Sequence, residues 1–139
     1  MKLLIDANIL LDVLAERERH YHNSSLIWKL CETGQAEGCI TALTVANLVY
    51  IMRKKLDAGT TAEMITKLQL IFTVEDFCVS DLVRAAKMKW NDFEDAVQSA
   101  AAFRIHADFI ITRNTSDFIK SPVKPLSPDA FLSGQYRKK

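Results

Sequence analysis

The chain has 139 residues, of which 49% are hydrophobic and 25% are charged, and its formal net charge is +1. That length fits one domain with a sizeable core, and that charge excludes a protein that binds nucleic acid or membranes through its overall charge. No apolar run approaches the ~20 residues that cross a bilayer, and the N-terminus does not resemble a signal peptide. Three cysteines without metal-ligand spacing suit a reducing compartment. We therefore expect a cytoplasmic protein that does not contact membranes.

Strand and helix patterns alternate along the first half of the chain. They predict a strand at 2–6, a helix at 9–16, a loop at 17–23, a helix at 24–33, a strand at 37–41 and a helix at 43–56. Good helix-capping residues precede the three helices, namely Asn8, Ser24, and either Thr41 or Thr44. The basic residues 53–55 fall in the last turn of the third helix, where cations suit the helix dipole.

The same alternation continues in the second half. It predicts a helix at 60–72, a strand within 72–79, helices at 81–88 and 93–106, a strand at 108–112 and a short helix at 127–132. The expected caps are Thr60 or Thr61, then Ser80, Asp92 and Ser127. Strands that alternate with helices indicate an α/β fold with a mainly parallel sheet, and right-handed crossovers place helices on both faces.

Acidic and amide side chains gather where such a fold places its functional crevice, at the carboxyl ends of the strands. They are Asp6 after the first strand, Asp92, Glu94 and Asp95 in the first turn of the helix at 93–106, and Asn114 and Asp117 after the strand at 108–112. If these two strands are neighbours, the groups converge. Carboxylates that lie close together raise each other's pKa, and a hard divalent cation such as Mg²⁺ or Mn²⁺ resolves the repulsion.

Several of these residues also have simple structural explanations. Asp92 can cap the helix that follows it, and Asp117 can cap a short turn. Asp12 lies six residues after Asp6, so it points elsewhere, and a salt bridge explains it as well as a site role. Arg113 is either a bidentate phosphate clamp or a surface ion pair. Asp6 has no local backbone role comparable to a cap, so we expect it to serve the site.

The stretches "LLIDANILLDVL", "NDFEDAVQSAAA", "DFIITRNTSDF" and "PLSPDAFL", in this order and spacing, resemble the PIN domain family of metal-dependent ribonucleases. The resemblance covers essentially the whole chain and implies a five-stranded parallel sheet around an acidic pocket that holds Mg²⁺ or Mn²⁺. Asp6 and Asp95 match two of the family's acids, and either Asn114 or Asp117 fills the last position. Many PIN domains carry a Glu in the helix after the second strand, where this chain has Asn47.

The resemblance implies a metal-dependent endoribonuclease over residues 1–132, with a flexible tail at 133–139. Asp6 and Asp95 would hold the metal, and Asp117 or Asp92 would orient the attacking water. The residues expected to contact the phosphate or to support the acids are Asn8, Asn47, Thr112, Arg113 and Asn114. Glu94 or Asp92 could compensate for the missing charge at Asn47.

The small prokaryotic PIN proteins that this chain most resembles include many toxins of VapBC-type toxin–antitoxin pairs. This resemblance implies an RNA substrate, a small antitoxin as partner and a homodimer. Because Asn47 carries no charge, an alternative is a PIN-like module that binds RNA or protein with little catalysis. A phosphohydrolase that uses Asp6 as nucleophile fits less well, because Asn8 stands where such enzymes repeat the acid.

Overall fold

The computed structural model describes residues 1–134. Its strands are β1 (Lys2–Ile5), β2 (Glu37–Thr41), β3 (Thr73–Glu75), β4 (Phe109–Ile111) and β5 (Pro125–Leu126). Its helices are α1 (Ala7–Leu14), α2 (Tyr21–Glu32), α3 (Ala42–Ile51), α4 (Ala58–Ile71), α5 (Val79–Met88), α6 (Phe93–Arg104), the 3-10 helix η1 (Thr115–Phe118) and α7 (Pro128–Leu132). Most of the predicted tail, 135–139, lies outside the described residues. No helix within residues 1–134 combines the length and apolarity needed to cross a membrane.

The five strands form one parallel sheet in the order β3-β2-β1-β4-β5. This confirms the predicted α/β class. The chain leaves β1 toward β2 on one side and later returns to β4 on the other, so the strand order reverses beside β1. The carboxyl ends of β1 and β4 therefore flank the crevice of the sheet. Asp6 and Thr112 follow directly after these two ends.

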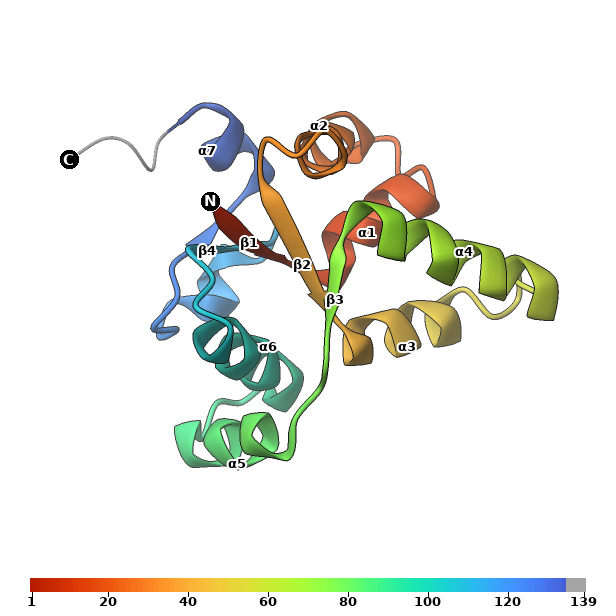
Figure 1. The fold of residues 1–139 in the computed structure, drawn as a ribbon. Helices are drawn as coiled ribbons and strands as arrows, with labels where there is room; N and C mark the ends of the chain where they lie inside the picture. Colours follow the sequence, from red (N-terminus) through yellow and green to blue (C-terminus); the bar gives the residue numbers. More distant parts are fainter. Residues whose placement is uncertain (135–139) are drawn as a thin grey trace.

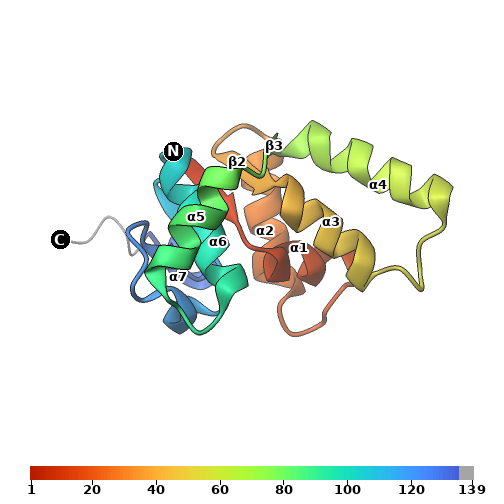
Figure 2. The same cartoon turned by 90° about the horizontal axis from the view of Figure 1, so that it is seen from below.

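Helices cover both faces of the sheet, as Figures 1 and 2 show. Alternate residues of β1 point to opposite faces: Leu3 and Ile5 pack under one set of helices, and Leu4 under the other. The first set is α1, α2, α3, α4 and α7, and the second is α6 with α5 outside it. The alanine-rich middle of α6 is buried, which lets α5 and the sheet approach it closely.

Two predicted helix starts in the first half were displaced, and the third helix ends earlier than predicted. Helix α1 is capped by Asp6, not by Asn8, because the strand passes into the helix with a single intervening residue. Helix α2 begins at Tyr21 inside the predicted loop, and its N-cap His20 makes no side-chain capping bond. Thr41 caps α3 as one of the two predicted alternatives, but α3 ends at Ile51, so the basic residues 53–55 lie beyond it.

Two further helix starts differ from the prediction. Helix α4 is capped by Asp57, and Thr60 is instead the third helical residue of a reciprocal capping box. Helix α5 begins at Val79, and its N-cap is Cys78, two residues before the predicted cap Ser80. The caps Asp92 of α6 and Ser127 of α7 are confirmed.

Candidate active site

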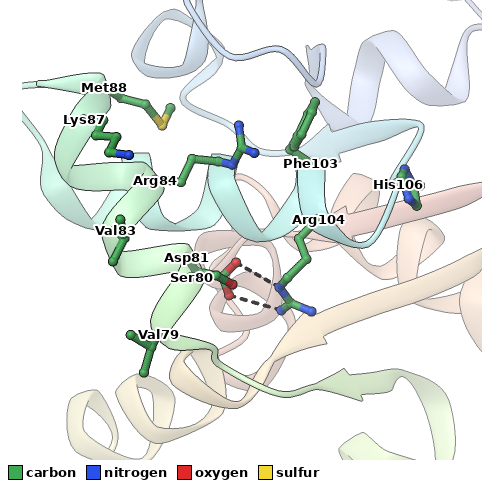
Figure 3. Close-up of a pocket in the computed structure, with 10 residues that line it drawn as sticks. All are labelled: Val79, Ser80, Asp81, Val83, Arg84, Lys87, Met88, Phe103, Arg104 and His106. Atoms are coloured by element: carbon green, nitrogen blue, oxygen red, sulfur yellow. Dashed lines mark hydrogen bonds and ion pairs between the residues drawn. The ribbon is translucent and has the colours of Figure 1, made fainter.

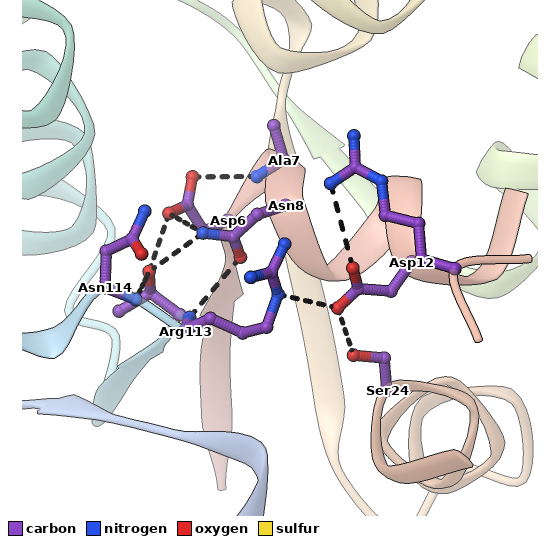
Figure 4. A network of polar contacts seen from close by, with 9 residues as sticks. Asp6, Ala7, Asn8, Asp12, Ser24, Arg113 and Asn114 are labelled. Carbon is purple, nitrogen blue, oxygen red and sulfur yellow. Dashed lines mark hydrogen bonds and ion pairs between the residues drawn. The ribbon is translucent and has the colours of Figure 1, made fainter. Parts of the chain in front are cut away.

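The carboxylate of Asp6 is the centre of a hydrogen-bond network at the end of β1 (Figure 4). Its Oδ1 accepts from the Ala7 backbone N–H at 2.8 Å, and its Oδ2 accepts from Thr112 Oγ1 at 2.8 Å and from Asn8 Nδ2 at 3.3 Å. The expectation that Asp6 lacks a local backbone role was therefore wrong, because it caps α1. The same cap fixes the carboxylate where β1 and β4 end side by side.

Burial raises the pKa of Asp6, and the nearby carboxylate of Glu94 raises it further. The hydrogen bonds from Thr112 and Ala7, together with the charge of Arg113, oppose this shift. The balance leaves Asp6 harder to ionise than an ordinary aspartate. A cation placed beside it would favour the ionised form.

Asn8 supports this centre instead of capping the helix. Its amide donates to Thr112 Oγ1 at 3.4 Å as well as to Asp6, and its Oδ1 accepts from the Arg113 backbone N–H at 3.4 Å. Thr112 is fully buried, and its hydroxyl oxygen also accepts from the Asn114 backbone N–H at 3.1 Å. Asn8 and Thr112 thus join the start of α1 to the loop after β4 and hold Asp6 between them.

Arg113 lies beside this network, but its guanidinium is engaged with Asp12. Arg113 Nε donates to Asp12 Oδ2 at 2.9 Å, and Ser24 Oγ donates to the same oxygen at 2.7 Å. Asp12 is completely buried, and among residues 1–134 only the exposed Arg17 approaches its other oxygen, at 3.8 Å. The salt-bridge explanation is thus confirmed for both Asp12 and Arg113, although their pair is buried on one side instead of lying on the surface.

Three of the predicted acids line one pocket of about 320 Å³ beside α6 and η1. They are Asp92, Asp95 and Asp117. Asp92 also caps α6, because its Oδ1 accepts from the Asp95 backbone N–H at 3.1 Å. Within residues 1–134, no side chain forms a hydrogen bond or ion pair with the Asp95 carboxylate. Asp117 lies in η1, and no capping bond of its side chain is found in the described part of the chain.

The pKa of Asp95 is raised to about 7, mainly by burial. The carboxylates of Asp92, Asp6, Asp117 and Glu94 raise it further, in that order. The acids after β1, in α6 and in η1 therefore interact electrostatically, as the sequence predicted. Asn114 contributes only its backbone to the described network, so Asp117 is the better candidate for the last acidic position.

Asn47 reaches the site through Glu94. Its Nδ2 donates to Glu94 Oε1 at 2.8 Å and so joins α3 to the first turn of α6. One turn deeper, Gln98 Nε2 donates to Thr44 Oγ1 at 2.8 Å, and the buried Gln98 Oε1 has no hydrogen-bond partner in the described part of the chain. Sequence reasoning missed this second bridge, although Gln98 stands one helical turn after Asp95.

The donor set fits a hard divalent cation. Among residues 1–134, no three His, Cys, Asp or Glu side chains are close enough together to hold a metal ion by themselves. Mg²⁺, however, is commonly held by one or two carboxylates and keeps several waters or substrate phosphates. Asp6 and Asp95 supply two carboxylates, and the unpartnered Asp95 stands in a site with excess negative charge.

A five-stranded parallel sheet with carboxylates at the reversal point of its strand order defines an α/β domain with a candidate acidic metal site. A model of the PIN domain matches residues 2–116. The chain belongs to the PIN domain family. A comparison with proteins of curated function found no match.

Solved structures show the same fold. The chain is similar to FitAcB from Neisseria gonorrhoeae, with a TM-score of 0.68 and 18% identity over 91% of this chain and 97% of that chain. It is also similar to VapBC2 from Rickettsia felis bound to a promoter DNA fragment, with a TM-score of 0.66 and 15% identity over 91% and 98% of the two chains. A toxin–antitoxin complex from Klebsiella pneumoniae is also similar, with a TM-score of 0.65 and 22% identity over 91% of this chain and 97% of that chain.

Proposed function

We propose that this PIN domain is a metal-dependent endoribonuclease. The observation that carries the proposal is the electrostatic coupling of Asp6 and Asp95 at the carboxyl edge of the sheet. Their repulsion is relieved when a divalent cation lies between them. Such an ion would stabilise the charge that develops on a phosphodiester and would favour ionisation of a bound water.

The chain's own groups have distinct roles in this proposal. Asp6 and Asp95 hold Mg²⁺ or Mn²⁺, and Thr112 with Asn8 fixes the orientation of the Asp6 carboxylate. Asp117, or Asp92 where it is not engaged as a cap, orients the attacking water and accepts its proton. Asn47 contributes by holding Glu94, whose carboxylate supplies charge that Asn47 itself lacks.

We further propose that the protein acts as the toxin of a toxin–antitoxin pair in the cytoplasm, as a homodimer that a small antitoxin protein inhibits. Support comes from the similar structures, one of which is described as a toxin–antitoxin complex. Because those chains are at most 22% identical to this one, the partner is an inference from the shared fold. Co-expression with the product of the neighbouring reading frame, followed by purification through a tag on one chain, tests the pairing.

A cleavage assay tests the ribonuclease proposal. Purified protein is incubated with RNA and Mn²⁺, with and without EDTA, alongside Asp6→Asn. This variant keeps a side-chain oxygen for capping α1 and loses the charge that binds metal. Cleavage that requires Mn²⁺ and is lost in the variant supports the proposal. Equal cleavage by the variant, or no cleavage by the wild type, refutes it.

The alternative is a PIN-like module that binds RNA or protein with little catalysis. The observation that favours it is the absence, in the described range 1–134, of three clustered metal-ligating side chains. A module of this kind would bind RNA equally well with Mn²⁺ and with EDTA and would leave the RNA intact. The same assay therefore separates the two functions.

A further inference from the structure

A groove lies outside the acidic site, between α5 and α6 (Figure 3). It has a volume of about 860 Å³. Arg104 lines this groove, but its guanidinium is already hydrogen-bonded within the protein. It donates to the buried Asp81 at 2.9 and 3.1 Å and to the Asp76 carbonyl at 2.8 Å. Arg84 lies over the exposed ring of Phe103 at 4.4 Å and remains accessible at the rim.

This groove is connected to the acidic pocket. A second depression of about 320 Å³ shares Arg84 and Met88 with the groove. The acidic pocket in turn shares Trp90 and Lys120 with this second depression. The three depressions thus adjoin one another beside α5 and α6, and we call them the path; its last depression contains Asp92, Asp95 and Asp117.

Four cations accompany the path, and we call them the basic track: Arg84, Lys87, Lys89 and Lys120. All four are exposed, and within residues 1–134 none is paired with a carboxylate. Asp81, the one acid among the described residues that line the groove, already forms an ion pair with Arg104. A chain with a net charge of only +1 therefore concentrates unpaired positive charge beside its acidic pocket.

Lys89 is the cation of the track that lies at the end of α5. Lys89 ends α5 in the left-handed conformation, with φ at 56°, a position that usually favours glycine. Lys89 lines the acidic pocket together with Trp90 and Lys120. The end of α5 therefore places a cation beside the three acids.

We propose that the basic track binds the backbone of a single RNA strand and leads it into the acidic pocket. The inference rests on the proposed ribonuclease function and identifies where its substrate lies. Lys89 and Lys120 offset the repulsion between phosphates and acids at the pocket, while Arg84 and Lys87 hold the strand farther out. The partly exposed ring of Trp90 offers a surface on which a base can stack.

An RNA strand explains the path better than an acidic peptide does. A peptide would need only the apolar groove between α5 and α6, where Val79 and Val83 are exposed. The cations, however, continue beyond this groove to the acidic pocket, which a phosphodiester must reach for cleavage. The continuity of the three depressions therefore favours the nucleic acid.

Fluorescence anisotropy with a short fluorescein-labelled oligouridine tests the track in EDTA, where no metal-dependent cleavage can occur. Four phosphate contacts on a single strand predict that affinity falls about 50-fold between 50 and 200 mM salt. Two double variants each remove two of these contacts: Arg84→Gln/Lys87→Gln and Lys89→Gly/Lys120→Gln. In each of them the RNA affinity should fall only about sevenfold over the same range of salt. Glycine suits the left-handed backbone at position 89, so this variant should unfold at no lower temperature than the wild type.

The matched control is Lys54→Gln/Lys55→Gln, which removes two exposed lysines in the segment after α3 and should keep the 50-fold loss. If RNA binding by both track variants depends on salt as it does in the wild type, the proposal is overturned, and a protein partner becomes the better candidate for the groove. RNA binding with the expected salt dependence but no cleavage with Mn²⁺ would refute the ribonuclease function and retain the track. Cleavage without any effect of the track variants on binding would refute the track alone.

Discussion

Asn47 donates a hydrogen bond of 2.8 Å to the carboxylate of Glu94, and so an amide on α3 holds an acid on α6 beside the candidate metal site. By its resemblance to PIN domains, the sequence lacks a negative charge at position 47, where many family members have a Glu. The structure shows that the charge at this side of the site is carried by Glu94, which acts on both Asp6 and Asp95. We propose that Glu94, held by Asn47, supplies the negative charge that position 47 lacks.

Asn47→Ala should lower the free energy of unfolding by about 0.5–1 kcal/mol, because it removes a partly exposed hydrogen bond to a charged group. Glu94→Gln is the matched variant, since its carbonyl oxygen can still accept from Asn47. Its loss should be smaller than that of Asn47→Ala in urea denaturation. A larger loss in Glu94→Gln would show that the charge, and not the hydrogen bond, joins α3 to α6.

Asp12→Ala should destabilise the fold by about 3 kcal/mol, the low end for breaking a buried pair, because the Arg113 side chain remains 25% exposed. The change also leaves Ser24 without its acceptor. Chemical denaturation measures the loss. Arg17→Ala is the control, since this guanidinium lies 3.8 Å from Asp12 and is 42% exposed, and it should cost less than about 1 kcal/mol. Equal losses in the two variants would contradict the buried pair.

The stability of the metal-free protein should depend on the ionisation of Asp95. The pKa of Asp95 is about 7 in the folded chain and near 3.8 in the unfolded chain. Between these two pH values the folded state holds a proton that the unfolded state has released. The contribution of this proton to the free energy of unfolding is therefore full below about pH 4 and is lost as the pH rises through about 7. Asp95→Asn removes the effect, because its side chain does not ionise.

Thermal unfolding in EDTA at pH about 5 and about 8 measures this dependence. We expect Asp95→Asn to unfold at a higher temperature than the wild type at the higher pH, with a smaller difference at the lower pH. At the higher pH, Mg²⁺ should raise the unfolding temperature of the wild type toward its value at the lower pH. A difference that does not change with pH would place the Asp95 carboxylate outside any cluster of negative charge.

Gly38→Ala should destabilise the sheet by about 1–3 kcal/mol through overpacking. A methyl group at this position of β2 would lie 2.5 Å from Cys31 Sγ and 2.8 Å from Phe72 Cδ1, so α2 and the end of α4 would have to move. Gly59→Ala, where the nearest atom is 3.5 Å away, is the control and should not destabilise α4. Equal thermal unfolding temperatures in the two variants would contradict the close packing.

The sequence predicted the elements better than their ends. Strand β2 was predicted with its observed bounds, because a short apolar run is flanked by clear breaks. The cap of α1 was misplaced, because Asp6 and Asn8 are both good capping residues two positions apart. Strand β5 has only two residues and no periodicity of its own, so only the family resemblance implied a fifth strand.

The convergence of the acids could be predicted, because the carboxyl ends of neighbouring parallel strands lie at the same edge of a sheet. Its supporting contacts could not. Arg113 and Asp12 are 101 residues apart, and Asn47 and Glu94 are 47 apart, so only the packing of the helices brings each pair together. The basic track depends on the same packing, because Lys120 and Arg84 meet on one surface only after α5 folds against α6.

Calorimetric titration of the metal-free protein with Mn²⁺ at pH about 8, where Asp95 is ionised, tests the metal site most directly. The wild type should bind Mn²⁺, and Asp95→Asn should weaken the affinity by at least about tenfold, a loss seen even for residues that only orient a metal ligand. Glu63→Gln, an exposed acid on α4, should bind as the wild type does. Equal affinities in the wild type and Asp95→Asn would contradict the metal site.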